Sequence, residues 1–189
     1  ALERQQARQH LGFQDDDKVL LFAAMKVSDE RKGFSYLQSA LQCLKKSRPD
    51  LPLKILVLGQ IDQAARAQLP FETVTPGLIS DPARLATLYA ASDLFVIPSL
   101  EDNLPNTVME SLACGTPVVA TDCPSGPREI LDGGRFGPLI PIGDAAAMQR
   151  AIAAVLDAPL PAATLQSAIA EYTLPRACAG YLRAFGLAG

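Results

Sequence analysis

The sequence predicts a doubly wound α/β fold, in which helices cover both faces of a parallel sheet of about six strands. Short apolar runs rich in β-branched residues alternate along the chain with longer stretches of helical spacing. Strands that are apolar on both faces are typical of parallel sheets covered on both sides. The chain has 189 residues, of which 49% are apolar, and is therefore long enough to bury a substantial core.

The elements alternate in chain order. Strands are expected at residues 19–24, 54–59, 93–99, 117–122 and 136–142, with a weaker strand at 72–78. Helices are expected at residues 34–46, 82–92, 105–115 and 144–158. From about residue 160 the helical spacing is broken by Pro161 and Pro175, which predicts two or three terminal helices. The sequence has no internal repeat or long linker, so residues 1–189 are most simply one domain.

Composition and charge argue against several functions. The net charge is −3 and the basic residues are scattered, so no nucleic-acid surface is expected. His10 is the only histidine, which argues against a histidine-rich metal site or a Ser-His-Asp triad within the chain. The glycine fingerprint of nicotinamide and flavin sites is missing. Residues 15–17 are three aspartates, but they precede the first strand, at the wrong edge of the sheet, and are interpreted as a charged turn.

The cellular location is predicted from what the sequence lacks. No apolar run reaches 18 residues, and the first residues resemble neither a signal peptide nor a transit peptide. The four cysteines are far apart without a CxxC pair, and are expected to be small buried hydrophobes in a reducing compartment. We therefore expect a soluble, cytoplasmic domain. Because Ala1 is not methionine, we also expect a piece of a longer protein.

The segment 98–122 places acidic residues between two predicted strands. Glu101 and Asp102 follow the strand that ends near Ser99, and Glu110 lies one to two turns into the next helix. In doubly wound sheets, ligands bind at the carboxyl ends of the strands. Eight positions separate Asp102 from Glu110, so their carboxylates can accept hydrogen bonds from different parts of a long ligand. The alternative, that Glu101 and Asp102 only complement the helix dipole, leaves Glu110 unexplained.

The start of the same helix is a candidate phosphate site. Pro105 is expected early in the helix, with Asn103 or Leu104 at the cap. The N–H groups of the first helical residues would point outward, where they and the helix dipole attract an anion. These residues are Asn106, Thr107 and Val108.

Two further loops are predicted at this edge of the sheet. Lys26, Arg31 and Lys32 follow the first strand in a glycine-containing loop, and three positive charges there would suit a diphosphate. The alternative is a solvated basic turn that pairs with its neighbouring acids. In the loop 123–131, Gly126 is expected to let the backbone approach a ligand, and Arg128 is a candidate for a charged or surface contact.

Together these segments resemble the C-terminal, nucleotide-sugar-binding domain of the retaining glycosyltransferases of GT-B architecture, of the group 1 or family 4 type. The pieces run in family order along nearly the whole chain, and their combination is specific although no single piece is. They are ARQHLGF (7–13), KGF (32–34), GLISDPARLATLYAASDLFVIPSLED (77–102), PNTVMESLACGTPVVATD (105–122), GPREI (126–130) and GPLIPIGD (137–144). The resemblance implies a Rossmann-like domain, the C-terminal half of a GT-B fold.

The resemblance implies roles for the two acids. In the family, two acids eight positions apart frame the donor; the first meets the transferred sugar and the second meets the ribose. These positions fall on Asp102 and Glu110. Because the family usually has glutamate at the first position, either Asp102 fills it with a shorter side chain or Glu101 swings in, and the spacing favours Asp102.

The resemblance also implies how the rest of the donor is bound. The family holds the diphosphate with an arginine and a lysine after the first strand; Lys32 matches the lysine, and Lys26 is the substitute for the arginine. The base would lie near Leu78 and Ile79. Asp102 and Lys32 are therefore the expected catalytic residues. The expected donor-binding residues are Glu110, Lys26, Asn103, Leu104, Pro105, Asn106, Thr107, Val108, Leu78 and Ile79.

The implied reaction transfers a hexose, with retention, from a UDP-, GDP- or ADP-sugar to a glycan or lipid-linked acceptor, without a metal or other cofactor. Polysaccharide biosynthesis is the expected context. The N-terminal acceptor domain would be missing from this chain, so we expect donor binding but little transfer, and association with the inner face of the membrane only through that missing half. The alternative is a non-catalytic nucleotide or nucleotide-sugar binding module, which needs Glu110 but no acid facing the sugar.

Overall fold

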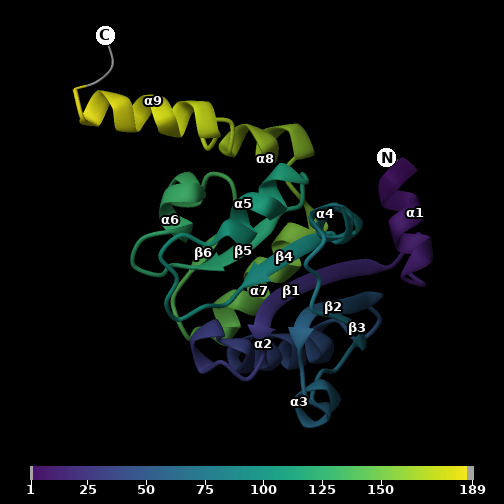
Figure 1. Ribbon diagram of the computed structural model, residues 1–189. Helices are drawn as coiled ribbons and strands as arrows, with labels where there is room; N and C mark the ends of the chain where they lie inside the picture. Colours follow the sequence, from purple (N-terminus) through teal and green to yellow (C-terminus); the bar gives the residue numbers. More distant parts are fainter. Residues whose placement is uncertain (1, 187–189) are drawn as a thin grey trace.

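The computed structural model describes residues 2–186 and confirms the predicted fold: one parallel sheet with the order β3-β2-β1-β4-β5-β6, covered by helices on both faces (Figure 1). The strands are β1 (Lys18–Lys26), β2 (Leu53–Gln60), β3 (Glu72–Gly77), β4 (Leu94–Ile97), β5 (Val118–Thr121) and β6 (Leu139–Ile140). The helices are α1 (Leu2–His10), α2 (Phe34–Ser47), α3 (Gln63–Ala67), α4 (Pro82–Ala91), α5 (Asn106–Ala113), α6 (Pro127–Ile130), α7 (Ala145–Asp157), α8 (Ala162–Ala168) and α9 (Leu174–Ala184), with 3-10 turns η1 (Glu30–Lys32) and η2 (Asp132–Gly134).

All six predicted strands are present, but β6 is much shorter than expected. Residues 136–142 were expected to form it, whereas only Leu139 and Ile140 pair with β5. Pro138 and Pro141 flank these two residues, and proline has no N–H to extend a ladder. The predicted helices are present as α2, α4, α5 and α7, while the short α3 was not predicted.

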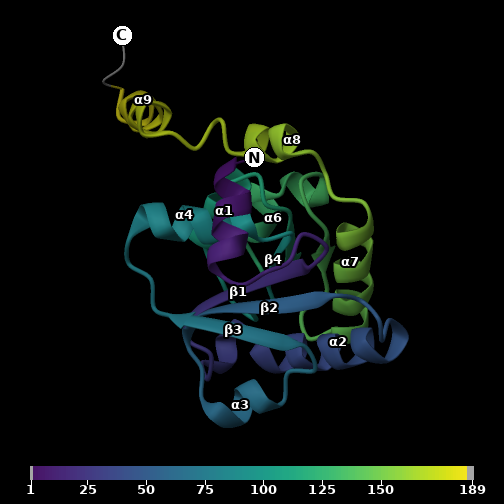
Figure 2. The same cartoon turned by 90° about the vertical axis from the view of Figure 1, so that its right-hand side faces the viewer.

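The strands divide the core into two layers. Alternate residues of a strand point to opposite faces of the sheet. Leu20 and Phe22 of β1 therefore pack beneath α2 and α7, whereas Val19 and Leu21 pack beneath α4 and α5 (Figure 2). Because β1, β2, β4 and β5 are covered on both sides, their interiors are apolar, which is the pattern that predicted the parallel sheet. The edge strand β3 is more polar and only partly buried.

The tail forms two helices, within the predicted range. Leu165 of α8 is fully buried against the core that contains α5. Helix α9 has no buried residue and lies apart from the sheet in both views (Figures 1 and 2). No helix within residues 2–186 combines the length and the apolar character needed to span a bilayer.

Two local predictions are wrong. Pro105 is the N-cap of α5 rather than an early helical residue, since its backbone is extended and its carbonyl accepts the N–H of Val108 at 2.9 Å. The expectation of buried cysteines holds for Cys123 only. Cys43 is exposed because it lies on the outer face of α2, and Cys178 is exposed because α9 buries no residue.

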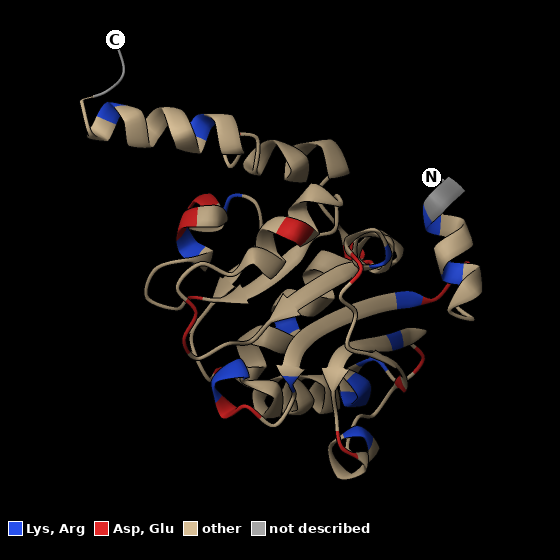
Figure 3. Cartoon of the chain, in the orientation of Figure 1, with Lys and Arg blue, Asp and Glu red and all other residues tan. Residues whose placement is uncertain are grey.

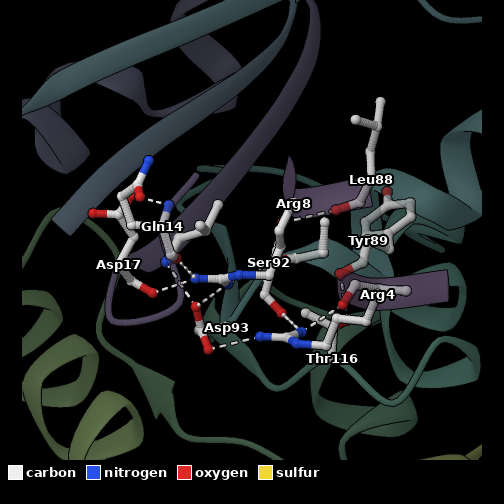
Figure 4. Close-up of polar contacts among 12 residues, drawn as sticks. Arg4, Arg8, Gln14, Asp17, Leu88, Tyr89, Ser92, Asp93 and Thr116 are labelled. Carbon is white, nitrogen blue, oxygen red and sulfur yellow. Dashed lines mark hydrogen bonds and ion pairs between the residues drawn. The ribbon is translucent and has the colours of Figure 1, made fainter. Parts of the chain in front are cut away.

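The amino edge of the sheet is closed by a buried arginine that the sequence did not reveal. Arg8 of α1 donates to the carbonyls of Ala91 (3.1 Å) and Gln14 (3.0 Å), donates to the carbonyl of Asp17, and pairs with Asp93 Oδ2 at 3.1 Å (Figure 4). The side chain of Arg8 is 9% exposed. Helix α1 is thereby tied to the end of α4 and the start of β4.

The aspartates that precede β1 lie at this amino edge, as predicted. However, only Asp15 and Asp16 behave as the expected charged turn, because they are exposed. Asp17 is buried, and its carboxylate accepts the backbone N–H of Gln14 at 2.8 Å. This hydrogen bond stabilises the turn that leads from α1 into β1.

Candidate functional site

A cavity of about 460 Å³ opens at the carboxyl edge of the sheet. It lies beside β1 and β4, where the strand order reverses and the helices that follow the two strands, α2 and α5, cover opposite faces of the sheet. Figure 3 shows basic and acidic residues together in the loop after β1, whereas the interiors of the strands carry few charges. The predicted site residues that line the cavity are Lys26, Lys32, Leu78, Ile79, Asp102, Thr107 and Glu110.

The remaining predicted residues do not line the cavity. Asn103, Leu104 and Asn106 are exposed, and Pro105 is buried beneath the loop. Val108 is fully buried in the core, and its N–H already donates to Pro105. The prediction that the N–H of Val108 points out of the helix is therefore corrected; no side chain in the described part of the chain caps α5, whose first residues are Asn106 and Thr107.

The loops after β1 and β4 pack backbone against backbone. Gly33 has φ of +66°, and a Cβ at this position would lie 1.8 Å from the carbonyl oxygen of Pro98. The N–H of Leu100 also donates to the carbonyl of Arg31 at 2.7 Å. A side chain at residue 33 would separate the loops, so glycine is required for the contact that brings the basic loop to the acidic loop.

Asp102 faces this contact. Its Oδ2 accepts hydrogen bonds from Lys32 Nζ at 3.1 Å and from Ser99 Oγ at 3.3 Å. The side chain of Asp102 is 16% exposed and that of Lys32 is 36% exposed, whereas Glu101 is exposed and does not line the cavity. Of the two acids that the sequence left open, Asp102 is the one beside the cavity.

The loop after β5 supports the acidic loop from behind. Cys123 Sγ donates to the carbonyl of Ser99 at 2.9 Å, and Thr121 Oγ1 donates to the same carbonyl. Gly126 has φ of +60°, and a Cβ there would lie 2.6 Å from the carbonyl oxygen of Asn103. The close approach expected at Gly126 is therefore made to the backbone of the acidic loop. Burial raises the pKa of the Cys123 thiol, so it stays protonated and donates.

Arg128 makes a surface contact, one of the two roles that the sequence left open. Its Nε donates to Asp122 Oδ1 at 2.9 Å, and its guanidinium forms a second contact with Asp122 Oδ2. This hydrogen bonding raises the pKa of Arg128. Arg128 does not line the cavity at the carboxyl edge.

Glu110 is held by a residue that sequence reasoning missed. The hydroxyl of Tyr89, in α4, donates to Glu110 Oε2 at 3.1 Å. Burial raises the pKa of Tyr89, and the nearby carboxylate of Glu110 raises it further, so the phenol stays neutral. Helical spacing marks Tyr89 only as part of an apolar helix face, and no sequence signal links it to an acid 21 positions away.

The three cations of the basic loop differ in their partners. Arg31 binds Asp29 through Nε–Oδ1 (3.1 Å) and Nη2–Oδ2 (2.9 Å), and this hydrogen bonding lowers the pKa of Asp29 and raises that of Arg31. Lys32 pairs with Asp102. Lys26 is exposed, and among the side chains of residues 4–186 no carboxylate lies within ion-pair distance of it. Arg31 thus pairs with a neighbouring acid, as the alternative of a solvated basic turn expects, whereas Lys32 pairs with a distant one; both line the cavity.

The cavity also has an apolar side. Leu78 and Ile79, which follow β3, line it together with Leu85 of α4 and Met25 of β1. Leu78 is 56% exposed and Met25 is 78% exposed, so both offer apolar surface to a ligand. The cavity thus offers acids and cations on one side and an apolar surface on the other, and can take a ligand that combines anionic, hydroxyl and flat apolar groups.

Comparisons with known proteins agree on one family. A family model described as "Glycosyl transferases group 1" matches residues 17–158. A D-inositol 3-phosphate glycosyltransferase of Paenarthrobacter aurescens (strain TC1) is 31% identical over 145 residues, which cover 72% of this chain and 35% of that protein. The match thus spans about a third of the relative's length.

Solved structures share the fold. A glycosyltransferase from Rickettsia africae ESF-5 has a TM-score of 0.77 at 19% identity, with 97% of this chain and 51% of that chain covered. The pneumococcal O-GlcNAc transferase GtfA, in complex with UDP and GlcNAc, has a TM-score of 0.70 at 18% identity, with 90% and 36% covered. The chain belongs to the group 1 glycosyl transferases, and its fold is that of the C-terminal domain of their GT-B architecture.

Proposed function

We propose that this chain is the donor-binding domain of a retaining glycosyltransferase, which binds a nucleoside diphosphate sugar for hexosyl transfer to a glycan or lipid-linked acceptor. The observation that carries the proposal is the gathering of Lys32, Asp102 and Glu110 around one cavity at the carboxyl edge. Membership of the group 1 family supports it. UDP in the structure of GtfA makes a uridine nucleotide a reasonable first ligand, alongside GDP and ADP and their sugars.

The proposed roles follow the chemistry of each side of the cavity. Asp102 accepts hydrogen bonds from the transferred sugar, and Glu110 accepts them from the ribose, since carboxylates are acceptors with several lone-pair sites. Leu78 and Ile79 pack against the base on the apolar side. These groups lie around the same cavity and so fit one elongated ligand.

The diphosphate is proposed to lie between the sugar and the ribose. Lys26, Arg31 and Lys32 all line this cavity; Arg31 is paired with Asp29 and Lys32 with Asp102, so Lys26 has the freest charge. The backbone N–H groups of Asn106 and Thr107 add the positive end of α5. The proposed phosphate site therefore combines side-chain charges with a helix terminus.

In the proposed reaction, an acceptor hydroxyl attacks the anomeric carbon on the face from which the diphosphate departs. The bond from that carbon to the phosphate oxygen breaks, its electron pair stays on the diphosphate, and the hydroxyl proton passes to the departing phosphate. Lys32 and Lys26 stabilise the negative charge where it develops. Asp102 holds the sugar in position.

We also propose that residues 1–189 act as one domain of a longer, two-domain enzyme. The match covers only 35% of the glycosyltransferase from Paenarthrobacter aurescens, which supports this. The acceptor site would then lie on an N-terminal domain, and the isolated chain would bind donor but transfer little sugar. A cytoplasmic location and a role in polysaccharide assembly belong to the same proposal.

Calorimetric titration of the chain with UDP, GDP, ADP and their sugars tests the proposed function. We expect at least one nucleotide to bind with a dissociation constant below about 1 mM, and Glu110→Ala to weaken it about tenfold, as for the loss of a hydrogen bond to a charged group. Glu129→Ala, an exposed acid on α6 outside the cavity, is the control. No binding of any of these ligands at millimolar concentration would exclude the proposed donor site.

A second titration separates a transferase domain from a module that binds only the nucleotide. If Asp102 contacts the sugar, Asp102→Asn weakens binding of the nucleotide sugar more than binding of the matching nucleoside diphosphate. Equal effects on both ligands would favour the binding module. Glu101→Gln, one residue away and exposed, is the matched control and should change neither affinity.

A further inference from the structure

Tyr89 joins the two helices that border the cavity. It lies near the end of α4, is 1% exposed, and lines the cavity beside Glu110 of α5. Its hydroxyl donates to Glu110 Oε2 at 3.1 Å, and this is the contact that the structure gives to the side chain of Glu110. Glu110 itself is only partly buried, so its carboxylate would otherwise be free to turn between rotamers.

The position of Tyr89 is fixed at several points. Its carbonyl accepts the hydroxyl of Thr116 at 2.7 Å and the N–H of Ser92 at 2.9 Å (Figure 4). Its ring packs edge-on against Phe95 of β4, with centroids 5.6 Å apart and planes at 84°. Because these contacts fix both the backbone and the ring of Tyr89, the position of its hydroxyl is set by the core. The carboxylate of Glu110 is therefore oriented by the tyrosine, and not the reverse.

The direction of the hydrogen bond is also fixed. A neutral phenol is the donor toward an ionised carboxylate, and burial keeps the phenol neutral by raising its pKa. One carboxylate oxygen, Oε2, is thus engaged on the protein side. The other oxygen, Oε1, accepts no hydrogen bond from the side chains and backbone of residues 4–186, and Glu110 lines the cavity.

We infer that Tyr89 is a positioning residue that holds Glu110 Oε2 so that Oε1 is presented to the ribose hydroxyls, and that the Tyr89–Glu110 pair thereby selects ribonucleotide over 2′-deoxyribonucleotide donors. The inference rests on the proposed function, because it assumes that Glu110 meets the ribose. An acceptor that is already held loses less side-chain freedom when the ligand binds. A site built around a hydroxyl also rejects a ligand that lacks it, since the acceptor is then left unpaired.

The test is a double-mutant cycle on nucleotide binding. Wild type, Tyr89→Phe, Glu110→Ala and the double variant are titrated with UDP and 2′-deoxy-UDP, and with the GDP and ADP pairs. We expect wild type to prefer the ribonucleotide about tenfold, and Tyr89→Phe to reduce this preference to about threefold. In the Glu110→Ala background, Tyr89→Phe should leave the affinity unchanged, because the tyrosine acts through the glutamate.

Two controls separate positioning from stability. Thr116→Val removes one of the two hydrogen bonds to the carbonyl of Tyr89, while the N–H of Ser92 and the ring of Phe95 still hold the tyrosine. It should lower the melting temperature without changing the preference for ribose. Tyr181→Phe removes a phenol hydroxyl from an exposed residue of α9 and should change neither. A purely structural role for Tyr89 predicts that Tyr89→Phe behaves like Thr116→Val.

The possible outcomes are distinct. If wild type binds none of the nucleotides, both the proposed function and the inference are wrong. If nucleotides bind but Glu110→Ala leaves their affinity and the ribose preference intact, the proposed role of Glu110 is wrong and the inference falls with it. If Glu110→Ala abolishes the preference and Tyr89→Phe preserves it, the inference alone is overturned.

Discussion

The two edges of the sheet each carry an ion pair between distant parts of the chain, but the pairs differ in what surrounds them. At the amino edge, Arg8 is 9% exposed and donates to three carbonyls in addition to its contact with Asp93. At the carboxyl edge, Lys32 is 36% exposed and has Asp102 as its partner beside a cavity.

The difference teaches how to separate a structural ion pair from a candidate binding pair. Both terminal nitrogens of Arg8 donate to protein oxygens and the side chain is 9% exposed, so the pair is closed to a ligand on that side. Lys32 has three donors and only one of them is used in the pair. Unused donors and partial exposure beside a cavity therefore indicate a ligand site better than the burial or the strength of an ion pair does.

The largest effect is expected from Arg8→Ala, which removes a buried cation that donates to Asp93 and to the carbonyls of Ala91, Gln14 and Asp17. Asp93 keeps its contacts with Arg4 and with the N–H of Val19. The loss of four hydrogen bonds from a buried side chain should lower the free energy of unfolding by about 3 kcal/mol. Urea denaturation measures this loss. Arg48→Ala is the matched control, because its pair with Asp157 is partly exposed; it should cost less than about 1 kcal/mol. Equal losses would mean that the amino-edge pair is not structural.

The next effect concerns the contact between the loops. Gly33→Ala should lower the free energy of unfolding by about 2 kcal/mol or more, because alanine is strained at this φ and its Cβ would meet Pro98. Gly12→Ala has a similar φ of +77° but no heavy atom within 4 Å, and should cost only about 1 kcal/mol. Thermal or urea unfolding measures the stability of the two variants. If Gly33→Ala is as stable as Gly12→Ala, the proposed contact between the loops is contradicted.

Lys32→Ala should weaken nucleotide binding and have little effect on stability, whereas Arg8→Ala should mainly lower stability. We expect the free energy of unfolding to change by less than about 1 kcal/mol, since the pair is partly exposed. Nucleotide affinity should fall about tenfold, as for the loss of a charge-assisted hydrogen bond. Calorimetry measures the affinity, with Lys46→Ala on α2 as an exposed control. If Lys32→Ala is destabilised but binds nucleotide with unchanged affinity, the pair of Lys32 and Asp102 is structural and not part of a binding site.

The smallest effect is expected at the exposed pair of Arg31 and Asp29. Arg31 holds the pKa of Asp29 below its ordinary value of 3.8, so the pair contributes stability above that pH and loses it as pH falls through the lowered pKa. In Arg31→Ala the pKa of the Asp29 carboxyl should lie closer to 3.8. NMR titration of the carboxyl group measures this pKa. An unchanged midpoint would show that Arg31 is not the cause of the shift.

The sequence predicts well what depends on neighbouring residues. The β-branched runs located all six strands, and the eight-residue spacing of Asp102 and Glu110 placed both beside one cavity because a strand-to-helix junction connects them directly. Element ends were less accurate: Pro105 is a cap rather than a helical residue, and prolines shorten β6.

Contacts between distant parts of the chain could not be predicted in this way. Lys32 and Asp102 are 70 positions apart, and Arg8 and Asp93 are 85 apart. Tyr89 has the spacing of a core residue, and its hydroxyl gains a role only when α4 packs beside α5. Such pairs depend on the packing of the whole sheet and helices, which no local pattern records.

Amide NMR during titration with UDP, GDP or ADP tests most directly whether the carboxyl edge binds the ligand and the amino edge does not. We expect saturable shifts at Lys32, Leu78, Thr107 and Glu110, with Arg8 and Asp93 unaffected. Shifts concentrated around Arg8 and Asp93, or no shifts with any of the three nucleotides at millimolar concentration, would contradict this assignment of the two edges.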